Sequence, residues 1–371
     1  MFKPAAINAV SLILALQVYA QTPAPSAPPT AAGSAATAKS PAPSTSALPT
    51  TDQMIDSLGE ADLQSALSLL KSNFTNPDAI TESELNRATL TGLLVRMPGG
   101  LMLLPNRENT PAASATPIYS EIFENHIGYL RLGDLSAANL KELDKKLQEF
   151  SQKKVDAVVV DLRASNTGDF AAAAEVAKRF CPKGKALFSV RKAASKQDRQ
   201  FTSDREPAFQ GLIVVLADAD TAGSAEALAA TLKLNNKALI IGQSTSGRAV
   251  EYSDQPLPSG KILRVASAEA VLPDGQPLFP GGVKPDLPVE MPLADKRQIF
   301  RQSAEKGMGP FVYDGDRPHL NEAALIAGTN PELDISDAQR RLRPRSGLPM
   351  RDPVLQRALD VVTSLEIYQK R

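Results

Sequence analysis

Two short segments carry residue types suited to acyl-transfer chemistry. Residues 220–226 (DTAGSAE) follow an apolar run and open a helical pattern, and they hold Ser224. Gly247 and Arg248 lie in a second glycine turn, where Arg248 follows Gly223 by 25 positions. A serine at a strand-to-helix turn attacks a carbonyl when a neighbouring base accepts its proton. Arginine stays protonated in proteins and cannot be that base. Ser224 is therefore a candidate nucleophile without a candidate base, and helix capping is its alternative role.

Other residue types offer little metal or redox chemistry. The chain has two histidines, His126 and His319, and one cysteine, Cys181. This set lacks the ligand spacing of an ordinary zinc site and allows no intramolecular disulfide. We therefore expect no metal and no cofactor, and we assign both histidines to packing or surface positions.

Alternating strand and helix patterns fill the middle of the chain. Residues 157–162 and 212–217 are apolar runs typical of strands that are covered on both faces. Helical patterns follow them at residues 170–180 and 224–234, and a further strand-like run lies at residues 238–241. This βαβ repetition predicts an α/β fold with a mainly parallel sheet.

The patterns before and after these units complete the expected elements. A strand at residues 126–132 and a helix at residues 137–152 begin the main domain, and short strands at residues 262–266 and 268–272 form a hairpin-like tail to the sheet. Helical patterns at residues 51–74 and 81–97 form a small lead-in. A final apolar-periodic helix at residues 353–368 is expected to pack back on the domain.

The chain ends differ in composition from the middle. Lys3, an apolar stretch and small residues before Gln21 are typical of a signal peptide, so we expect an exported protein of the periplasm or cell envelope. The Pro-, Ala-, Ser- and Thr-rich stretch that follows cannot bury enough apolar surface to fold. The predicted organisation is a signal peptide at 1–20, a linker at 21–50, a helical lead-in and loop at 51–118, the main domain at 119–291 and a partly helical extension at 292–371.

The balance of charged residues argues against a nucleic-acid partner. Forty-one basic residues equal forty-one acidic ones, so no net field attracts nucleic acid. No stretch after the N-terminus approaches the length of a spanning helix. We expect neither a nucleic-acid partner nor an integral membrane span in the mature chain.

Several segments, taken in order, resemble the tail-specific (C-terminal processing) serine protease family. They are residues 127–132 (IGYLRL), 160–163 (VDLR), 220–226 (DTAGSAE), 241–248 (IGQSTSGR) and 282–286 (GVKPD). The resemblance covers about residues 126 to 290 and implies a crotonase/ClpP-like protease core. The family usually carries a PDZ domain before this core, which residues 98–118 are too few to hold.

The resemblance also assigns positions to the family's catalytic groups. It places the nucleophile at Gly223, the lysine at Arg248 and the supporting glutamine at Tyr252. A glycine has no side chain to attack a carbonyl, so the resemblance implies a degenerate serine-lysine dyad. The oxyanion hole would be formed by backbone N–H groups at Gly168 and Ser224.

Three functions stay open at this point. The first is binding of a peptide or protein C-terminus, or a small ligand, without cleavage, through Gly168, Ser224 and Arg248. The second is an active serine-type endopeptidase that uses Ser224 as a fallback nucleophile. The third is binding of a lipid or small apolar ligand, which an apolar cavity beneath the helix at residues 224–234 would support.

Overall fold

The computed structural model describes residues 50–76, 80–105, 116–135, 137–166, 169–192, 197–312 and 350–369. The chain divides into two compact units, Met1–Pro77 and Asp78–Arg371. The predicted signal peptide, and all of the predicted linker except Thr50, lie outside the described residues. Within the described ranges, no helix is both long and apolar enough to cross a membrane.

The first unit contains two helices where the sequence pattern predicts one. α1 (Thr51–Asp56) begins with a capping box in which Thr50 Oγ1 accepts from the backbone N–H of Gln53. α2 (Glu60–Asn73) begins after Gly59, whose backbone is extended. The predicted single helix is therefore wrong, because Gly59 interrupts an apolar periodicity that continues across it.

The second unit is built on a six-stranded sheet with a mainly parallel arrangement. Only β2 runs antiparallel to its neighbour, and all other pairs are parallel. The strand order is β11-β8-β7-β4-β3-β2. The strands are β2 (Tyr119–Phe123), β3 (Ile127–Arg131), β4 (Ala157–Asp161), β7 (Leu212–Ala217), β8 (Leu239–Gly242) and β11 (Leu287–Pro288). This arrangement confirms the predicted α/β fold class.

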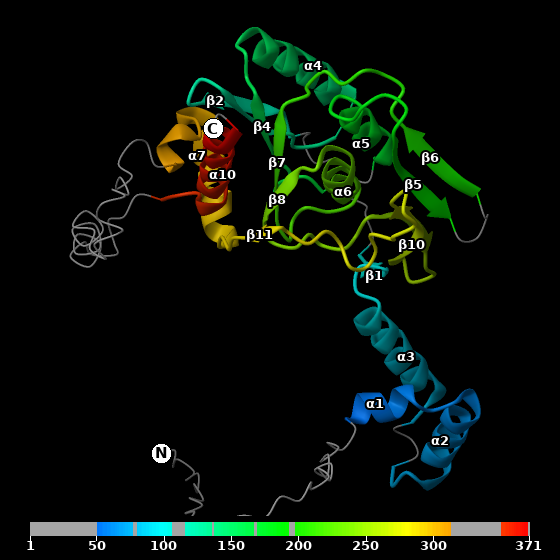
Figure 1. Cartoon of the computed structure of the whole chain (residues 1–371). Coiled ribbons are helices and arrows are strands. Elements are labelled where there is room, and N and C mark those ends of the chain that lie inside the picture. The colour runs from blue at the N-terminus through cyan, green and yellow to red at the C-terminus, as the bar shows by residue number, and fades with distance from the viewer. Residues whose placement is uncertain are drawn as a thin grey trace, which may run out of the picture. The chain divides into compact units, whose positions relative to one another are not determined.

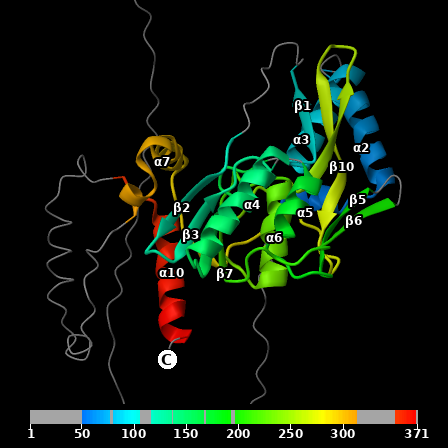
Figure 2. The ribbon, with the colours of Figure 1, turned by 90° about the horizontal axis from the view of Figure 1, so that it is seen from above.

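Helices cover both faces of this sheet (Figures 1 and 2). One face carries α4 (Ala137–Gln152), α5 (Phe170–Ala177) and α6 (Ser224–Asn236), and the other carries α7 (Leu293–Lys306) and α10 (Pro353–Gln369). Val158 and Val160 face the first core, whereas Val159 faces the second. Because both faces are buried, β4 reads as an unbroken apolar run.

A second, five-stranded antiparallel sheet contains β1, β5, β6, β9 and β10. Their bounds are Leu101–Leu104, Ala186–Lys192, Gln197–Thr202, Val250–Pro256 and Ile262–Val271. The predicted hairpin of two short strands is wrong, because residues 262–271 form one strand with a register shift between Ala266 and Ala268. The hairpin partner of β10 is β9, which the sequence patterns did not predict, across a turn that ends at Gly260.

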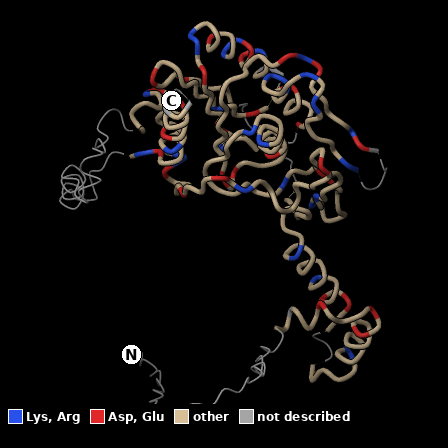
Figure 3. The backbone as a smooth tube through the Cα atoms, viewed as in Figure 1, with Lys and Arg blue, Asp and Glu red and all other residues tan. Residues whose placement is uncertain are grey.

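An additional helix precedes this sheet, and charges are spread along the unit. α3 (Glu82–Arg96) follows its N-cap residue Thr81, whose Oγ1 accepts from the backbone N–H of Glu84. Basic and acidic residues are interspersed along the trace (Figure 3). This distribution agrees with the equal totals of the two charge types.

A buried ion network joins the carboxyl end of β4 to the start of α10. Arg163 Nη2 lies 2.7 Å from Asp161 Oδ2 and 2.8 Å from Asp352 Oδ2. All three side chains are 1% exposed or less. Asp352 also accepts from the backbone N–H of Leu355 at 2.9 Å, and Tyr129 donates its phenol proton to Asp161 at 2.7 Å. The C-terminal helix is thus anchored to the sheet through charged groups inside the core.

Candidate functional site

Gly223 lies in the turn between β7 and α6, at the carboxyl edge of the parallel sheet. It is the N-cap residue of α6, with φ of 64° and ψ of −127°. The segment before it is hydrogen-bonded to the residues that follow β4, because the backbone N–H of Ala222 donates to Ser165 O at 3.0 Å. Thr221 Oγ1 also donates to Leu162 O at 3.0 Å. A sharp strand-to-helix turn with a strained residue at its tip is how many hydrolases present a nucleophile. Here that tip has no side chain.

The carboxylate of Glu226 joins this turn to the turn that carries Arg248. Glu226 is fully buried. Its oxygens accept hydrogen bonds from Gly223 N (3.1 Å), Arg248 N (2.7 Å), Gly247 N (2.7 Å), Thr245 Oγ1 (2.5 Å) and Ser246 Oγ (3.3 Å). Gly223 and Arg248 donate to the same oxygen, Oε2. The two positions assigned by resemblance are therefore side by side in the fold.

The charge state of Glu226 reflects two opposing influences. Burial raises the pKa of this carboxyl above its usual value, while the hydrogen bonds from Thr245 and the backbone N–H groups act to lower it. Donors on both turns converge on one carboxylate, so the geometry of the two turns is coupled. The sequence patterns gave no signal for this organising role of Glu226.

Ser224 begins α6 but does not face solvent. Its relative exposure is 0%. A nucleophilic serine must be reachable by the carbonyl that it attacks. The burial of Ser224 therefore favours a role in the packing of the helix start over a role as a fallback nucleophile.

Arg248 is exposed, and its side chain crosses a glycine turn after α3. A Cβ atom built on Gly99 would lie 2.8 Å from Arg248 Cγ, so the aliphatic part of the arginine packs directly over this glycine. Tyr252 donates its phenol proton to Gly99 O at 2.7 Å. Among the described residues, no carboxylate lies within ion-pair distance of the Arg248 guanidinium. Gly99 belongs to this site although the sequence patterns gave no signal for it.

Lys296, on α7, binds the loop that connects the end of β7 to Gly223. Its Nζ donates to Asp218 at 2.5 Å, to Asp220 at 2.8 Å and to Arg163 O at 2.9 Å. Two carboxylate oxygens and one backbone carbonyl oxygen thus accept hydrogen bonds from this amine. Lys296 anchors the loop to α7, and local sequence patterns give no signal for this contact because Lys296 lies 78 residues from Asp218.

The GVKPD segment lies beneath the two turns. A Cβ atom built on Gly282, whose φ is 63°, would lie 2.6 Å from Thr245 Oγ1 and 3.1 Å from Glu226 Oε1. Asp286 Oδ2 accepts from the backbone N–H of Ile240 at 2.9 Å, and its Oδ1 pairs with Lys233 at 2.6 Å. This segment therefore ties β8 and α6 to the back of the site.

The remaining predicted site residues lie elsewhere. Gly168 and His319 are outside the described residues. Cys181 is fully buried, and burial raises the pKa of its thiol to about 12, which leaves it unreactive. His126 precedes β3 at the amino edge of the sheet, whereas Gly223 follows β7 at the carboxyl edge. His126 therefore takes no part in this site.

Comparisons with known proteins place the domain in a family. Residues 126–289 match the model of peptidase family S41. The carboxyl-terminal-processing protease of Synechocystis sp. is 27% identical over 190 residues, which cover 50% of this chain and 44% of that protein. The carboxy-terminal processing protease CtpA of Bacillus subtilis is 27% identical over 210 residues, which cover 56% and 42%. The chain thus spans less than half the length of these two relatives.

Solved structures with a similar fold include the photosystem II D1 C-terminal processing protease, at 23% identity and a TM-score of 0.40, covering 51% of this chain and 47% of that one. Another is a peptidase-like protein from Parabacteroides merdae, at 16% identity and a TM-score of 0.49, covering 65% and 85%. The family match spans all the elements from β3 to β11. Residues 126–289 of this chain therefore form a domain of peptidase family S41.

Proposed function

We propose that this S41 domain binds a peptide or protein C-terminus without cleaving it, in the cell envelope after export. The observation that carries the proposal is Gly223 at the tip of the β7–α6 turn, where a nucleophile would have to stand. Its neighbour across the Glu226 carboxylate is a permanent cation instead of an amine that can lose its proton. Neither half of a serine-lysine dyad is present at these two positions.

The same arrangement favours an anionic ligand. Arg248 is exposed, its backbone N–H shares the Glu226 carboxylate with that of Gly223, and Gly223 is the N-cap of α6. Helix N-termini carry partial positive charge, and arginine binds carboxylates through paired hydrogen bonds. The C-terminal carboxylate of a protein or peptide is an anion that would complement these positive charges. Gly168, if it contributes an N–H group as the resemblance implies, would act on the same anion.

The rival enzyme proposal needs Ser224 as a nucleophile. Its hydroxyl is buried at the start of α6, and Arg248 cannot accept its proton. Both facts weigh against an endopeptidase that uses this serine.

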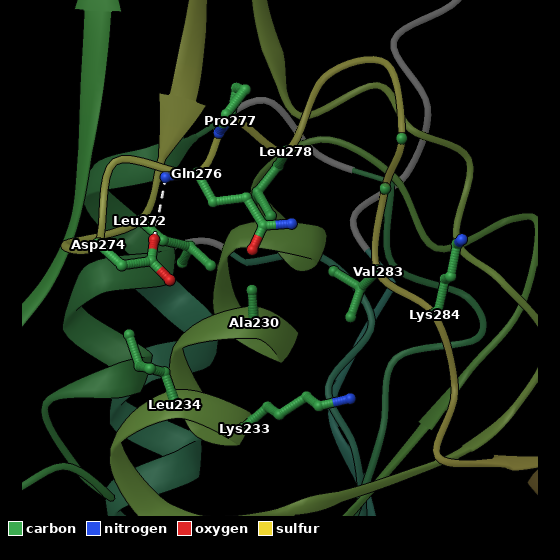
Figure 4. A pocket seen from close by; sticks show the side chains of 12 residues that line it. Ala230, Lys233, Leu234, Leu272, Asp274, Gln276, Pro277, Leu278, Val283 and Lys284 are labelled. Atoms are coloured by element: carbon green, nitrogen blue, oxygen red, sulfur yellow. Dashed lines mark hydrogen bonds between the residues drawn. The ribbon is translucent and has the colours of Figure 1, made fainter.

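A second candidate function, binding of a small apolar ligand, is favoured by a pocket beside α6. The pocket has a volume of about 610 Å³ and lies between α6 and the loop that precedes β11 (Figure 4). Its apolar walls come from Ala230, Leu234, Leu272, Leu278 and Val283. Lys284 and Asp274 also line it, and Lys233 pairs with Asp286, so Lys284 is the cation that a ligand with one acidic group would contact.

Arg248→Gln is expected to weaken binding of a peptide that ends in a free carboxylate by about tenfold, because it removes one charge-assisted hydrogen-bond donor. Fluorescence anisotropy with a labelled unstructured peptide measures the affinity, and mass spectrometry tests whether the peptide stays intact. Arg264→Gln is the matched control, because Arg264 already pairs with Asp254 on the antiparallel sheet.

Amidation of the peptide C-terminus should have the same effect as Arg248→Gln. If amidated and free peptides bind equally well to the wild-type protein, the carboxylate proposal is wrong. If only a fatty acid or another small apolar acid binds, and Leu234→Arg abolishes this binding, the second candidate replaces the first.

A further inference from the structure

We propose that His126, Asp156 and Glu366 form a binding site for a divalent transition-metal ion, with Zn²⁺ as the best match. One ligand atom from each of the three side chains lies within 4.8 Å of the others. This proposal departs from the expectation of no metal, which rested on the spacing of histidine and cysteine in the sequence. The spacing could not reveal the site because Glu366 is 240 residues from His126.

The parallel sheet brings the first two residues together. Ile127 pairs with Ala157 across β3 and β4, and the backbone N–H of Asp156 donates to His126 O at 3.1 Å. His126 and Asp156 are therefore neighbours on adjacent strand starts. Glu366 reaches the same edge of the sheet from α10, which packs on the sheet face that α7 also covers.

The tight turn before His126 fixes its imidazole. Glu124 and Asn125 have positive φ values of 51° and 61° in the three-residue connection between Phe123 of β2 and Ile127 of β3. This turn places Glu124 O 2.5 Å from His126 Nδ1. A carbonyl oxygen only accepts hydrogen bonds, so Nδ1 carries the proton. In the neutral ring the lone pair is then on Nε2.

That lone pair faces a carboxylate. His126 Nε2 lies 3.0 Å from Glu366 Oε1. Both atoms are buried, and within the described part of the chain neither has a partner with hydrogen-bond geometry. Two electron-rich atoms at this distance repel each other unless a positive charge lies between or beside them. A metal ion on Nε2 and Oε1 would satisfy both atoms at once.

The surroundings match a known pattern of metal ligation. A histidine that binds a metal through one ring nitrogen usually donates the other N–H to a carbonyl or carboxylate, and Glu124 O supplies that partner here. Zinc bonds to nitrogen and carboxylate oxygen of about 2.0–2.2 Å imply ligand atoms roughly 3.3 Å apart in a tetrahedral site. The His126–Glu366 pair is close to that separation, and the exposed side chain of Asp156 is free to complete the site by a rotamer change.

The ligand set also indicates which ions to expect. One imidazole and two carboxylates suit Zn²⁺ or Mn²⁺, whereas Ca²⁺ and Mg²⁺ prefer oxygen ligands alone. Cys181 is fully buried and would not compete for the ion. The site lies at the opposite edge of the sheet from Gly223, so it would clamp α10 onto β3 and β4 and would take no part in peptide binding.

Isothermal titration of the chelator-stripped full-length protein with ZnCl₂ at pH 7.5 tests the site. The wild-type protein is expected to bind one equivalent with a dissociation constant at or below the micromolar range. His126→Gln and Glu366→Gln should each weaken binding by about 100-fold or more, because each removes a ligand. The chain's other histidine provides the matched control, and His319→Gln should bind as the wild type does.

Thermal unfolding gives an independent readout. Zn²⁺ should raise the melting temperature of the wild type and of His319→Gln, but not that of Glu366→Gln, which keeps the shape of the side chain. Zinc that binds equally well to the wild type, His126→Gln and Glu366→Gln is an adventitious ion and overturns the proposal. Absence of binding also overturns it and leaves His126 and Glu366 as a simple pair of contacting side chains.

Discussion

Arg163→Met is expected to lower the free energy of unfolding by about 3–5 kcal/mol at pH 7, which is the usual cost of removing one partner from a buried ion network. The methionine keeps most of the side-chain volume and lies next to Phe300 and Met291, so packing is largely preserved. What it leaves behind is two carboxylates, Asp161 and Asp352, without a counter-charge in the core.

Urea-induced unfolding between pH 4 and pH 8 measures this effect and its sign. Burial alone would raise the pKa of Asp161, but Arg163 and the phenol of Tyr129 hold it below its usual range. In the wild type this group therefore contributes stability above a pH of about 4 and loses it as the pH falls through the lowered pKa. In Arg163→Met burial dominates and raises the pKa, so the variant should lose stability as the pH rises.

The deficit of Arg163→Met should therefore be largest at neutral pH and shrink toward pH 4. Arg264→Met is the control, because the Arg264–Asp254 pair is partly exposed and should contribute at most about 1 kcal/mol. A loss below about 1 kcal/mol in Arg163→Met would mean that the C-terminal helix is not anchored through this network.

Gly247→Ala is expected to destabilise the protein by about 3 kcal/mol or more and to abolish peptide binding at Arg248. A Cβ atom at this position would lie 2.0 Å from Pro280 O, and the residue has a φ of 67°. The clash is with backbone, so no rotamer relieves it, and the left-handed φ adds about 1–2 kcal/mol. The turn would have to move, which would break the hydrogen bonds to Glu226 that position Arg248.

Gly275→Ala separates the cost of the steric clash from the cost of the left-handed φ. Gly275 has a φ of 88°, but a Cβ atom there would meet nothing within 4 Å. Thermal or urea unfolding should show only the smaller cost of the backbone conformation in this control, with peptide binding unchanged. Equal losses in the two variants would show that the contact with Pro280 is not a real constraint on the turn.

The parallel sheet was predictable because its strands carry a strong one-dimensional signal. Residues 157–161 are apolar at every position, since both faces of β4 are covered, and the helical pattern that opens at Ser224 begins where the structure begins α6. The antiparallel sheet gave a weaker signal. β6 and β9 contain charged and polar residues, and a register shift after Ala266 interrupts the alternation in β10.

The site was only partly predictable, because local sequence patterns do not show which distant residues come into contact. Gly223 and Arg248 could be located by resemblance, because the segments around them keep the family's order and spacing. The carboxylate that joins them could not be given its role, since five donors meet on Glu226 only after β7, α6 and β8 are assembled. Gly99, Lys296 and the pair of His126 with Glu366 depend on contacts between residues far apart in the sequence, which local patterns do not encode.

Covalent labelling tests most directly whether the Gly223–Arg248 site lacks an activated nucleophile. The purified wild-type protein is incubated with a serine-directed fluorophosphonate at pH 7 to 9, and intact-mass spectrometry measures the adduct, with an active serine protease as the positive control. We predict no adduct on the wild-type protein and no change in Ser224→Ala. A stoichiometric adduct that disappears in Ser224→Ala would contradict the claim and establish Ser224 as a working nucleophile.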